Sequence, residues 1–460
     1  LWAFPTMLRL VCLEILVSAL SELLPELGAP IPTQNVAATL RSLEHTECVA
    51  RSVANLGIVA NIPWKEFFRQ TSRVEAILRD DPAGVYARMD DETRDRYRRE
   101  LEELARGARV GEPAVAERVV ARARHESAGS ERKAHVGYWL VGEGRSAIEP
   151  ELRYRAGWRP RLGQWLRGHA VTMHVAPLVV ALAAALYVPV VYLQATGAGF
   201  LLRLVATVVI FFPASVIAIT LVHWLVTRVV PPRTLPKMDF DRGIPAEFAT
   251  AVVMPVLVGS REEAESLLDD LEGHYLTNPD PNAHFALLSD FLDAPSERMP
   301  GDEELLQALV EGVRRLNERY GKQGKGPFHV LHRPRLYNPS EGCWMAWERK
   351  RGKLEEFNEY VAGKLDRGFL AHEGDAAALR RIRFVVTLDA DTRLLPGSLS
   401  RLVGTLAHPL QRPEFDERTG RVVSGDTIVQ PRVEISPESG HRSLFARICS
   451  GDSAIEIYTR

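Results

Sequence analysis

Two long uncharged runs constrain the fold of this chain more than any other feature. Residues 175–193 contain no charged side chain, and residues 204–227 contain only His223 as an ionisable group. Each run is close to the roughly 20 residues that an α-helix needs to cross the hydrocarbon core of a bilayer. A short connection, residues 194–200, lies between them. The sequence therefore predicts a transmembrane helical hairpin with spans of about 175–194 and 204–227.

The alternative is a pair of buried helices in a large soluble core. Soluble helices of this length usually carry a polar stripe, and neither run has one, so the membrane hairpin is favoured. Prolines at 177, 189 and 213 are tolerated in membrane helices, because neighbouring groups satisfy the carbonyls that they free. We interpret His223 as a packed side chain near the membrane interface rather than as a proton relay.

Basic residues flank the hairpin and predict its orientation. They precede the first run and follow the second: Arg153, Arg155, Arg159, Arg161 and Arg167 before it, and Arg228, Arg233 and Lys237 after it. Between the two uncharged runs, Arg203 is the only charged residue. By the positive-inside bias, both flanks are expected in the cytoplasm. Residues 151–237 are thus expected to form the hairpin with its basic flanks.

Composition narrows the class of protein. A chain of 460 residues with 46% hydrophobic and 25% charged side chains can bury large cores, which excludes disordered and collagen-like proteins. A net charge of −2 gives no global electrostatic reason to expect a nucleic-acid partner. Cysteines 12, 48, 343 and 449 lack the CxxC spacing of a zinc site or the pattern of a disulfide scaffold. Because the chain starts with leucine, we expect an internal piece of a longer protein.

Residues 1–150 are expected to form a helical cytoplasmic region. The apolar stretch 7–24 is interrupted by charges and Pro25, which favours an amphipathic helix over a signal peptide. Residues 90–106 alternate acidic and basic side chains at three and four positions, a pattern typical of a solvated helix. No catalytic or ligand-binding motif is recognised in this region, so a soluble helical cap is favoured over a specific binding role.

After the hairpin, residues 238–460 alternate predicted strands and helices. Apolar runs of strand length at 251–258, 283–288, 329–332 and 382–388 are separated by segments with helical periodicity. Ser260 is a candidate N-cap for the first of these helices. Such alternation predicts an α/β domain, with a mostly parallel sheet covered on both faces.

Acidic residues follow two of these predicted strands. Asp290 follows the second strand, and Asp389 and Asp391 follow the fourth. Ligands of open α/β sheets lie beyond the carboxyl ends of the strands. Two carboxylates separated by a single residue repel each other, and a bound divalent cation relieves this repulsion. Mg²⁺ or Mn²⁺, with phosphate oxygens completing the coordination shell, suits such hard oxygen ligands. Residues 348–353 add four cations and a glycine, which suits a diphosphate.

Several motifs in order resemble the glycosyltransferase region of cyclic β-1,2-glucan synthases. The segments in the α/β region are VVMPVLV at 252–258, SD at 289–290, ERKRGKLEEFN at 348–358, TLDADT at 387–392 and VQPRVEI at 429–435. Upstream, LWAFPTMLRL at 1–10 and DPAGVYARMDDETRDRYRRE at 81–100 are similar to the stretch before that family's membrane helices. The resemblance covers nearly the whole chain.

The resemblance implies a multi-pass enzyme of the bacterial inner membrane with a cytoplasmic GT-A type domain. Such an enzyme transfers glucose from UDP-glucose with inversion to a growing β-1,2-glucan acceptor. Carried over residue by residue, Asp290 would hold the uridine, and Asp389 and Asp391 the metal and diphosphate. Lys350 and Gly352, in K-x-G-x-L, would lie near the phosphates. Pro255, in VVMPVLV, would belong to the donor site as well.

The resemblance also implies parts that this sequence does not contain. Processive glycosyltransferases place a general-base carboxylate and a Q-x-x-R-W-like acceptor motif well beyond the DxD, and only residues 392–460 follow it. The catalytic base is therefore expected beyond Arg460, and residues 1–460 alone are expected to be inactive. Two alternatives stay open: another processive UDP-sugar β-glycosyltransferase, such as a cellulose-synthase-like enzyme, and a non-catalytic membrane module.

Overall fold

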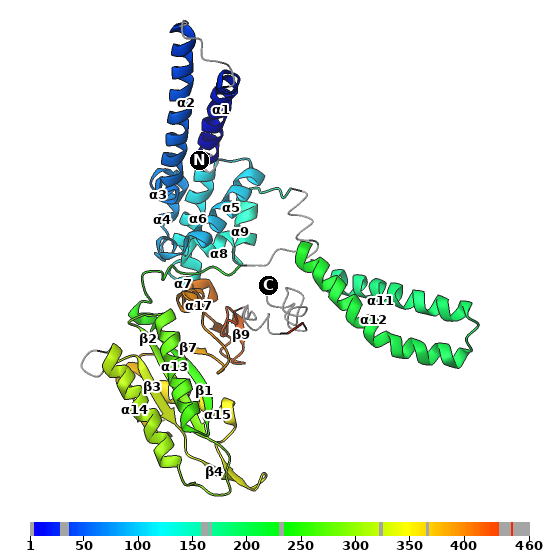
Figure 1. The fold of residues 1–460 in the computed structure, drawn as a ribbon, viewed down its shortest axis with the longest axis vertical. Coiled ribbons are helices and arrows are strands. Elements are labelled where there is room, and N and C mark those ends of the chain that lie inside the picture. Colours follow the sequence, from blue (N-terminus) through cyan, green and yellow to red (C-terminus); the bar gives the residue numbers. More distant parts are fainter. Residues whose placement is uncertain are drawn as a thin grey trace. The chain divides into compact units, whose positions relative to one another are not determined.

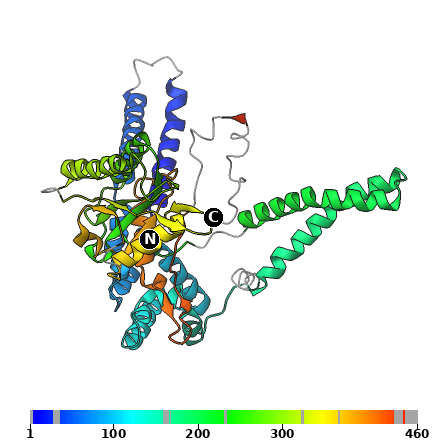
Figure 2. The same ribbon diagram turned by 90° about the horizontal axis from the view of Figure 1, so that it is seen from below.

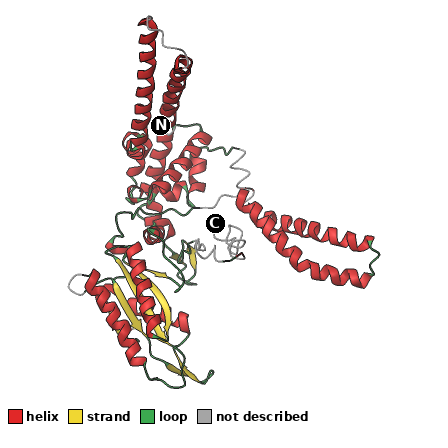
Figure 3. Ribbon diagram, viewed as in Figure 1, coloured by secondary structure: helices red, strands yellow, loops and turns green. Residues whose placement is uncertain are grey.

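The computed structural model describes residues 4–27, 36–157, 165, 168–229, 234–321, 325–364, 368–431 and 443–444. The chain divides into two compact units, residues 1–87 with 98–153 and residues 88–97 with 154–460. Among the described residues, strands occur only from Thr250 onward, and the segment before Asn61 is helical (Figure 3).

The described secondary-structure elements of the first unit are all helices. Their bounds are α1 (Phe4–Leu27), α2 (Val36–Asn61), α3 (Trp64–Thr71), α4 (Arg73–Arg79), η1 (Tyr86–Arg88), α5 (Asp91–Ala108), α6 (Glu112–Glu126), α7 (Glu131–Ala134), α8 (Val136–Leu140) and α9 (Arg145–Glu151). Both η1 and α5 cross the boundary between the units. The small core contains fully buried side chains from successive elements, such as Leu78, Leu101, Val119 and Ile148. The predicted helical region is confirmed, including the charged helix at α5.

The prediction of an amphipathic first helix is wrong in part. Residues 7–24 are helical, within α1, but apolar side chains surround the helix instead of forming one stripe. Leu13, Ile15 and Val17 are all exposed, although residues two positions apart in a helix point to nearly opposite sides of it. The predicted helix is confirmed, whereas the apolar periodicity is too weak to define one buried face.

A buried carboxylate fixes the loop between α4 and η1. The Asp81 carboxylate accepts hydrogen bonds from the backbone N–H groups of Val85 and Tyr86 at 3.0 Å and of Val136 at 2.9 Å, and it contacts His135 Nδ1 at 2.9 Å. Burial by itself raises the pKa of Asp81, but the His135 contact and the backbone donors outweigh it and hold the pKa below its usual value. These contacts explain why the segment that starts at Asp81 folds back on the helical core.

The two uncharged runs form a helical hairpin, α11 (Ala170–Ala195) and α12 (Phe200–Val229) (Figures 1 and 2). Both helices are long and apolar enough to cross a membrane, with mean hydropathies of 2.2 and 2.5, and they continue through all three prolines. Only 0% and 17% of their most apolar windows are buried, so the structure does not support two core helices of a soluble domain. Exposed apolar surface of this extent is typical of lipid-facing helices.

His223 is packed between the two helices, as expected. Its Nε2 lies 3.4 Å from Nε2 of His174 on α11, and the two imidazole rings stack with centroids 5.1 Å apart. The side chain is buried. The histidine pair therefore helps to join the helices of the hairpin.

A five-stranded sheet forms the centre of the α/β region. Its strands are β1 (Thr250–Val258), β2 (Ala283–Phe291), β3 (Phe328–His332), β6 (Ala371–Glu373) and β7 (Phe384–Thr387), in the order β6-β3-β2-β1-β7. Pairs β1–β2, β2–β3 and β1–β7 are parallel, with Val253 opposite both Ala286 and Thr387, whereas β3–β6 is antiparallel. The predicted, mostly parallel sheet is confirmed.

Helices cover both faces of this sheet. On one face, Tyr275 of α13 (Arg261–Thr277) packs against Phe285 and Phe328, beside α14 (Asp302–Tyr320). On the other face, Phe357 and Tyr360 of α15 (Arg349–Val361) join the core with alternate strand residues. The hydroxyl of Ser260 accepts from Glu263 N–H at 3.1 Å, which confirms the predicted N-cap of α13.

Several elements were not predicted. They are η2 (Ala246–Phe248), the hairpin β4 (Leu336–Asn338) and β5 (Cys343–Met345), strand β6, α16 (Ala376–Leu379), α17 (Ser398–Ala407), η3 (Pro409–Gln411), and the pair β8 (Glu414–Phe415) and β9 (Val422–Ser424). Most are too short to show a periodicity in sequence. The predicted motif at 429–435 lies mostly outside the described residues, which end at Pro431 there.

Candidate functional site

The strand order places a topological switch point between β1 and β7. The chain runs from β1 to β2 to β3 in one direction and then returns to the other side of β1 as β7. At such a topological switch point, the connections leave the two neighbouring strands toward opposite sides, and ligands of α/β sheets bind beyond the strand ends there. A binding site is therefore expected at the carboxyl ends of β1 and β7.

Pro255 lies where the ladder between β1 and β7 opens. Pairing between the two strands ends at Val253 with Thr387, and the Leu388 N–H donates to Val253 O at 2.9 Å. Residues 253 and 255 of β1 direct their backbone groups to the same neighbouring strand. Because Pro255 has no N–H, it ends the ladder on the β7 side without leaving an unpaired donor. This half-buried proline thus lies on the β7 side of β1, next to the switch point.

The DxD carboxylates follow β7 in an exposed turn. Thr392 N–H donates to Asp389 O at 3.0 Å, which closes the turn over Asp389–Thr392. Both aspartate side chains are exposed, whereas Leu388 just before them is buried and anchors the loop. Both aspartates therefore lie just beyond the end of β7, where the sequence places them.

Lys350 reaches the DxD loop from the first turn of α15. Its ammonium group forms an ion pair with the Asp389 carboxylate, and both side chains are about half exposed, at 52% and 59%. Lys350 also lies at the end of a shallow groove along the outer face of α15, which is lined by Arg351, Leu354, Glu355 and Asn358 among others. The structure thus brings together Lys350 and Asp389, which are 39 residues apart in the chain.

Asp290 occupies a different environment from the one expected. It was expected after the second strand, but β2 extends to Phe291, and the Asp290 side chain is fully buried. Arg333 binds it with two hydrogen bonds of 2.9 Å, from Nε to Oδ1 and from Nη2 to Oδ2. Lys353 Nζ lies 3.0 Å from Oδ2. Both carboxylate oxygens therefore have cationic partners from within the protein.

Arg333 also stabilises the turn that leads into α15. Its guanidinium donates to the backbone oxygens of Trp347 and Arg349 at 3.0 Å each. In this turn, Glu348 and Arg349 adopt left-handed backbone angles, with φ of 46° and 45°. For residues other than glycine, this conformation is strained and needs support from its surroundings. The Arg333 side chain, only 2% exposed, supplies that support.

Gly352 has a packing role at the same place. A β-carbon on Gly352 would collide with the Trp347 backbone oxygen and would lie 2.8 Å from Arg333 Nη1. Only glycine lets α15 approach the turn and the guanidinium this closely. Gly352 is thus buried behind Lys350 and sets the position of its backbone.

Burial changes the ionisation of the groups around Asp290. Burial lowers the pKa of Lys353, although the Asp290 carboxylate opposes this. Burial also raises the pKa of Glu356, which receives a hydrogen bond from Arg333 Nη1 at 3.0 Å. Nearby, burial lowers the pKa of His332 to about 4, so this imidazole is neutral at pH 7. The cluster thus combines a buried ionic core with a neutral histidine.

The sequence interpretation missed Arg333, and it counted Lys353 among the four cations of residues 348–353 suited to a diphosphate, whereas Lys353 is buried against Asp290. Arg333 directly follows β3, so the rule that singled out Asp290 and Asp389 could have found it. Lys353 carries no comparable signal, because basic residues on a helix are usually solvated. Its burial follows only from the packing of α15 on β1, where its ammonium also donates to Val256 O.

The DxD pair fits a hard divalent cation. It offers exposed carboxylate oxygens, the hard ligands that such cations prefer, although the ammonium of Lys350 pairs with Asp389. Two ligands leave several coordination positions for phosphate oxygens and water. Asp389 and Asp391 are thus the residues of this loop that could hold a divalent cation.

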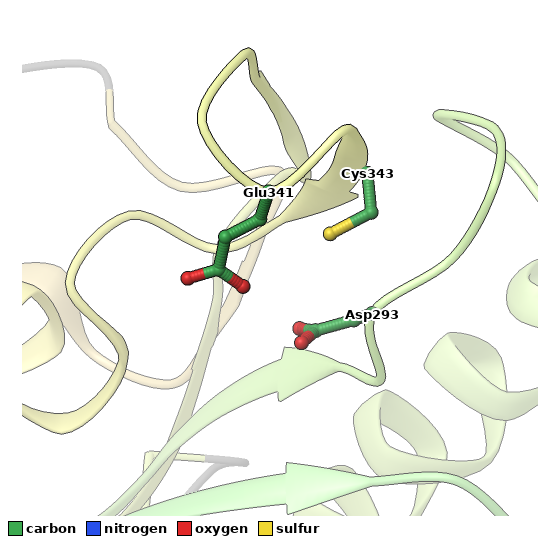
Figure 4. A group of neighbouring side chains, drawn as sticks. All are labelled: Asp293, Glu341 and Cys343. Carbon is green, nitrogen blue, oxygen red and sulfur yellow. The ribbon is translucent and has the colours of Figure 1, made fainter.

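A second group of possible ligands lies near the end of β2. Figure 4 shows Asp293, Glu341 and Cys343 pointing toward one another, with ligand atoms that all lie within 4.8 Å. Cys343 would contribute a sulfur ligand, and a thiolate does not suit Mg²⁺. This group is therefore a weaker candidate for the metal than the DxD pair.

Comparison with known proteins agrees with the motifs. Over 448 residues, or 96% of this chain, the sequence is 33% identical to the cyclic beta-(1,2)-glucan synthase NdvB of Rhizobium meliloti. The predicted resemblance to a cyclic β-1,2-glucan synthase is confirmed. No family model matches the sequence.

The similarity to this synthase includes the hairpin and the α/β region, because it extends over nearly all of this chain. The chain spans only 16% of the length of NdvB. The aligned part thus contains the candidate site, and the activity of the whole synthase is a property of a much longer protein.

Proposed function

We propose that this chain is the donor-binding glycosyltransferase region of a membrane-bound cyclic β-1,2-glucan synthase. In this proposal, a GT-A type domain in the cytoplasm transfers glucose from UDP-glucose, with inversion, to a growing β-1,2-glucan. The observation that carries the proposal is the DxD loop at the β1–β7 switch point with Lys350 beside it. The similarity to NdvB supports a glucan as the product.

The site suits a nucleoside diphosphate for electrostatic reasons. Lys350 supplies a point charge for phosphate oxygens, and the N-terminus of α15 adds the positive end of a helix dipole. A divalent cation held by Asp389 and Asp391 would neutralise the charge that develops on the departing diphosphate. Pro255 and the end of β1 would form the floor of the donor site.

The buried cluster gives Asp290 a supporting role in this proposal. Its two oxygens hold Arg333 and Lys353, and Arg333 holds the turn that carries Lys350. A direct contact between Asp290 and the uridine remains the prediction from the resemblance, and it would require one of these cations to move. No residue among those described is assigned as the general base.

We predict that α11 and α12 cross the membrane with both flanks in the cytoplasm. The reason is the arginine-rich flanks together with the exposed apolar surface of both helices. Single cysteines introduced in the intact protein at Arg155 and Asp241 should resist a membrane-impermeant thiol reagent in whole cells, whereas one at Gly197 should react. Labelling at position 155 or 241 from the outside would contradict this topology.

The product of the intact synthase tests the proposed function directly. Detergent-solubilised protein incubated with radiolabelled UDP-glucose and Mg²⁺ or Mn²⁺ should yield a glucan with 1,2-linkages by methylation analysis. Residues 1–460 alone should bind the donor without making polymer, because they correspond to only 16% of the length of NdvB. A 1,4-linked product would instead indicate a cellulose-synthase-like enzyme, and absence of UDP-sugar binding would indicate a non-catalytic membrane module.

A further inference from the structure

The ion pair between Lys350 and Asp389 joins the two ligand-binding parts of the site. Lys350 belongs to the proposed phosphate-binding turn, and Asp389 to the proposed metal-binding loop. We infer that Lys350 occupies Asp389 when no ligand is bound, so that a divalent cation and a nucleoside diphosphate bind cooperatively. The cation displaces the ammonium group from the carboxylate, and the displaced ammonium binds the phosphates. This inference rests on the proposed function.

The surrounding structure leaves the Lys350 side chain as the part that can move. Arg333 fixes the backbone oxygens of Trp347 and Arg349 on one side of Lys350, and the tight packing of Gly352 fixes the other side. The flexible four-carbon side chain of lysine can still carry its charge from one oxygen to another. Exchange between Asp389 and a phosphate therefore requires no change in the fold.

The exposure of the pair makes this exchange easy. Half-exposed ion pairs contribute little to folding stability, so breaking this one costs little. An ammonium in contact with a metal-binding carboxylate nevertheless opposes a cation at that carboxylate, because the two positive charges repel. When a diphosphate attracts the ammonium, that repulsion is removed. By thermodynamic linkage, each ligand must then strengthen the binding of the other by the same factor.

The neighbouring ion pairs indicate that this arrangement is specific to Lys350. Arg349 pairs with Asp293, and Arg351 pairs with Glu348 at 3.1 Å, so the adjacent basic residues have acidic partners outside the DxD. Only Lys350 among these three cations contacts a DxD carboxylate in the described part of the chain. A substitution that removes the charge of Lys350 should therefore raise the affinity for the metal and lower the affinity for the nucleotide.

The test measures binding of Mn²⁺ and UDP to the detergent-solubilised full chain, separately and together. Electron paramagnetic resonance reports free Mn²⁺, and titration calorimetry reports UDP. For Lys350→Met, we expect Mn²⁺ affinity without nucleotide to rise about 5- to 30-fold at low salt, the factor for removing one unit charge about 4 Å from a divalent ion in water. UDP affinity in the presence of Mn²⁺ should fall about tenfold or more, and the cooperativity between the ligands should decrease.

Arg314→Met is the matched control. Arg314 forms a similar helix-to-strand ion pair, with Glu373 of β6 at 2.9 Å, and β6 lies at the opposite edge of the sheet from β7. This control loses the same charge and should leave both affinities unchanged. Unchanged Mn²⁺ affinity in Lys350→Met, with a wild type that binds both ligands, would overturn the inference. A wild type that binds neither Mn²⁺ nor UDP would overturn the proposed function itself.

Discussion

Replacing Asp391 by asparagine in the intact synthase should slow glucan synthesis by two or more orders of magnitude. The substitution keeps the size of the side chain but removes one of the two charges that hold the proposed cation. Charge stabilisation by a bound metal is worth several kcal/mol in the transition state, and each ~1.4 kcal/mol changes the rate tenfold. Asp391 is exposed, so the fold should not depend on it.

The measurement is the initial rate of polymer formation from UDP-glucose over a range of Mn²⁺ concentrations. If Asp391 is a metal ligand, excess Mn²⁺ should partly restore the rate of Asp391→Asn. Asp269→Asn, which changes an exposed aspartate on α13, is the control and should behave as wild type. Wild-type turnover in Asp391→Asn would refute the metal assignment.

Removing the buried carboxylate of Asp290 should strongly destabilise the sheet around β2. The substitution Asp290→Ala leaves Arg333 and Lys353, only 2% and 3% exposed, without their shared acidic partner. Breaking a buried ion pair by removing one partner costs about 3–5 kcal/mol, because the remaining charge stays desolvated. The loss of stability should be largest in β2 and at the start of α15, because the strained turn before α15 is stabilised by the same Arg333 guanidinium.

Hydrogen exchange measured by mass spectrometry is suited to this prediction, because a protein of several units does not unfold in one step. Amide protection in β2 and α15 should fall by about two to three and a half orders of magnitude in Asp290→Ala, which corresponds to that energy range. Should this variant fail to fold, Asp290→Asn keeps the side-chain volume and should show a smaller loss of the same sign.

Asp293→Ala is the matched control for this prediction. Asp293 is three residues away and also pairs with an arginine, but its side chain is 34% exposed and that of Arg349 is 53% exposed. Exposed pairs contribute about 1 kcal/mol or less, so protection should change by no more than about fivefold. Equal effects of the two substitutions would show that burial of the Asp290 cluster does not matter for stability.

The regular elements of this protein could be predicted from local sequence. The runs 175–193 and 204–227 became α11 and α12, because the length and apolar character of a segment are sufficient to define such helices. Strands β1, β2, β3 and β7 were recognised in the same way, from short apolar runs between helical segments. The place of the DxD after β7 followed from the end of one such run.

Only the tertiary structure decided which polar groups meet. Asp290 and Asp389 look alike in sequence, since each follows an apolar run, yet one is fully buried and the other is 59% exposed. The difference comes from Arg333, 43 residues away from Asp290, and from the packing of α15. A carboxylate can be buried only where distant cations compensate its desolvation, and no local pattern encodes that pairing. Strand order, which places β7 beside β1, depends on the same long-range contacts.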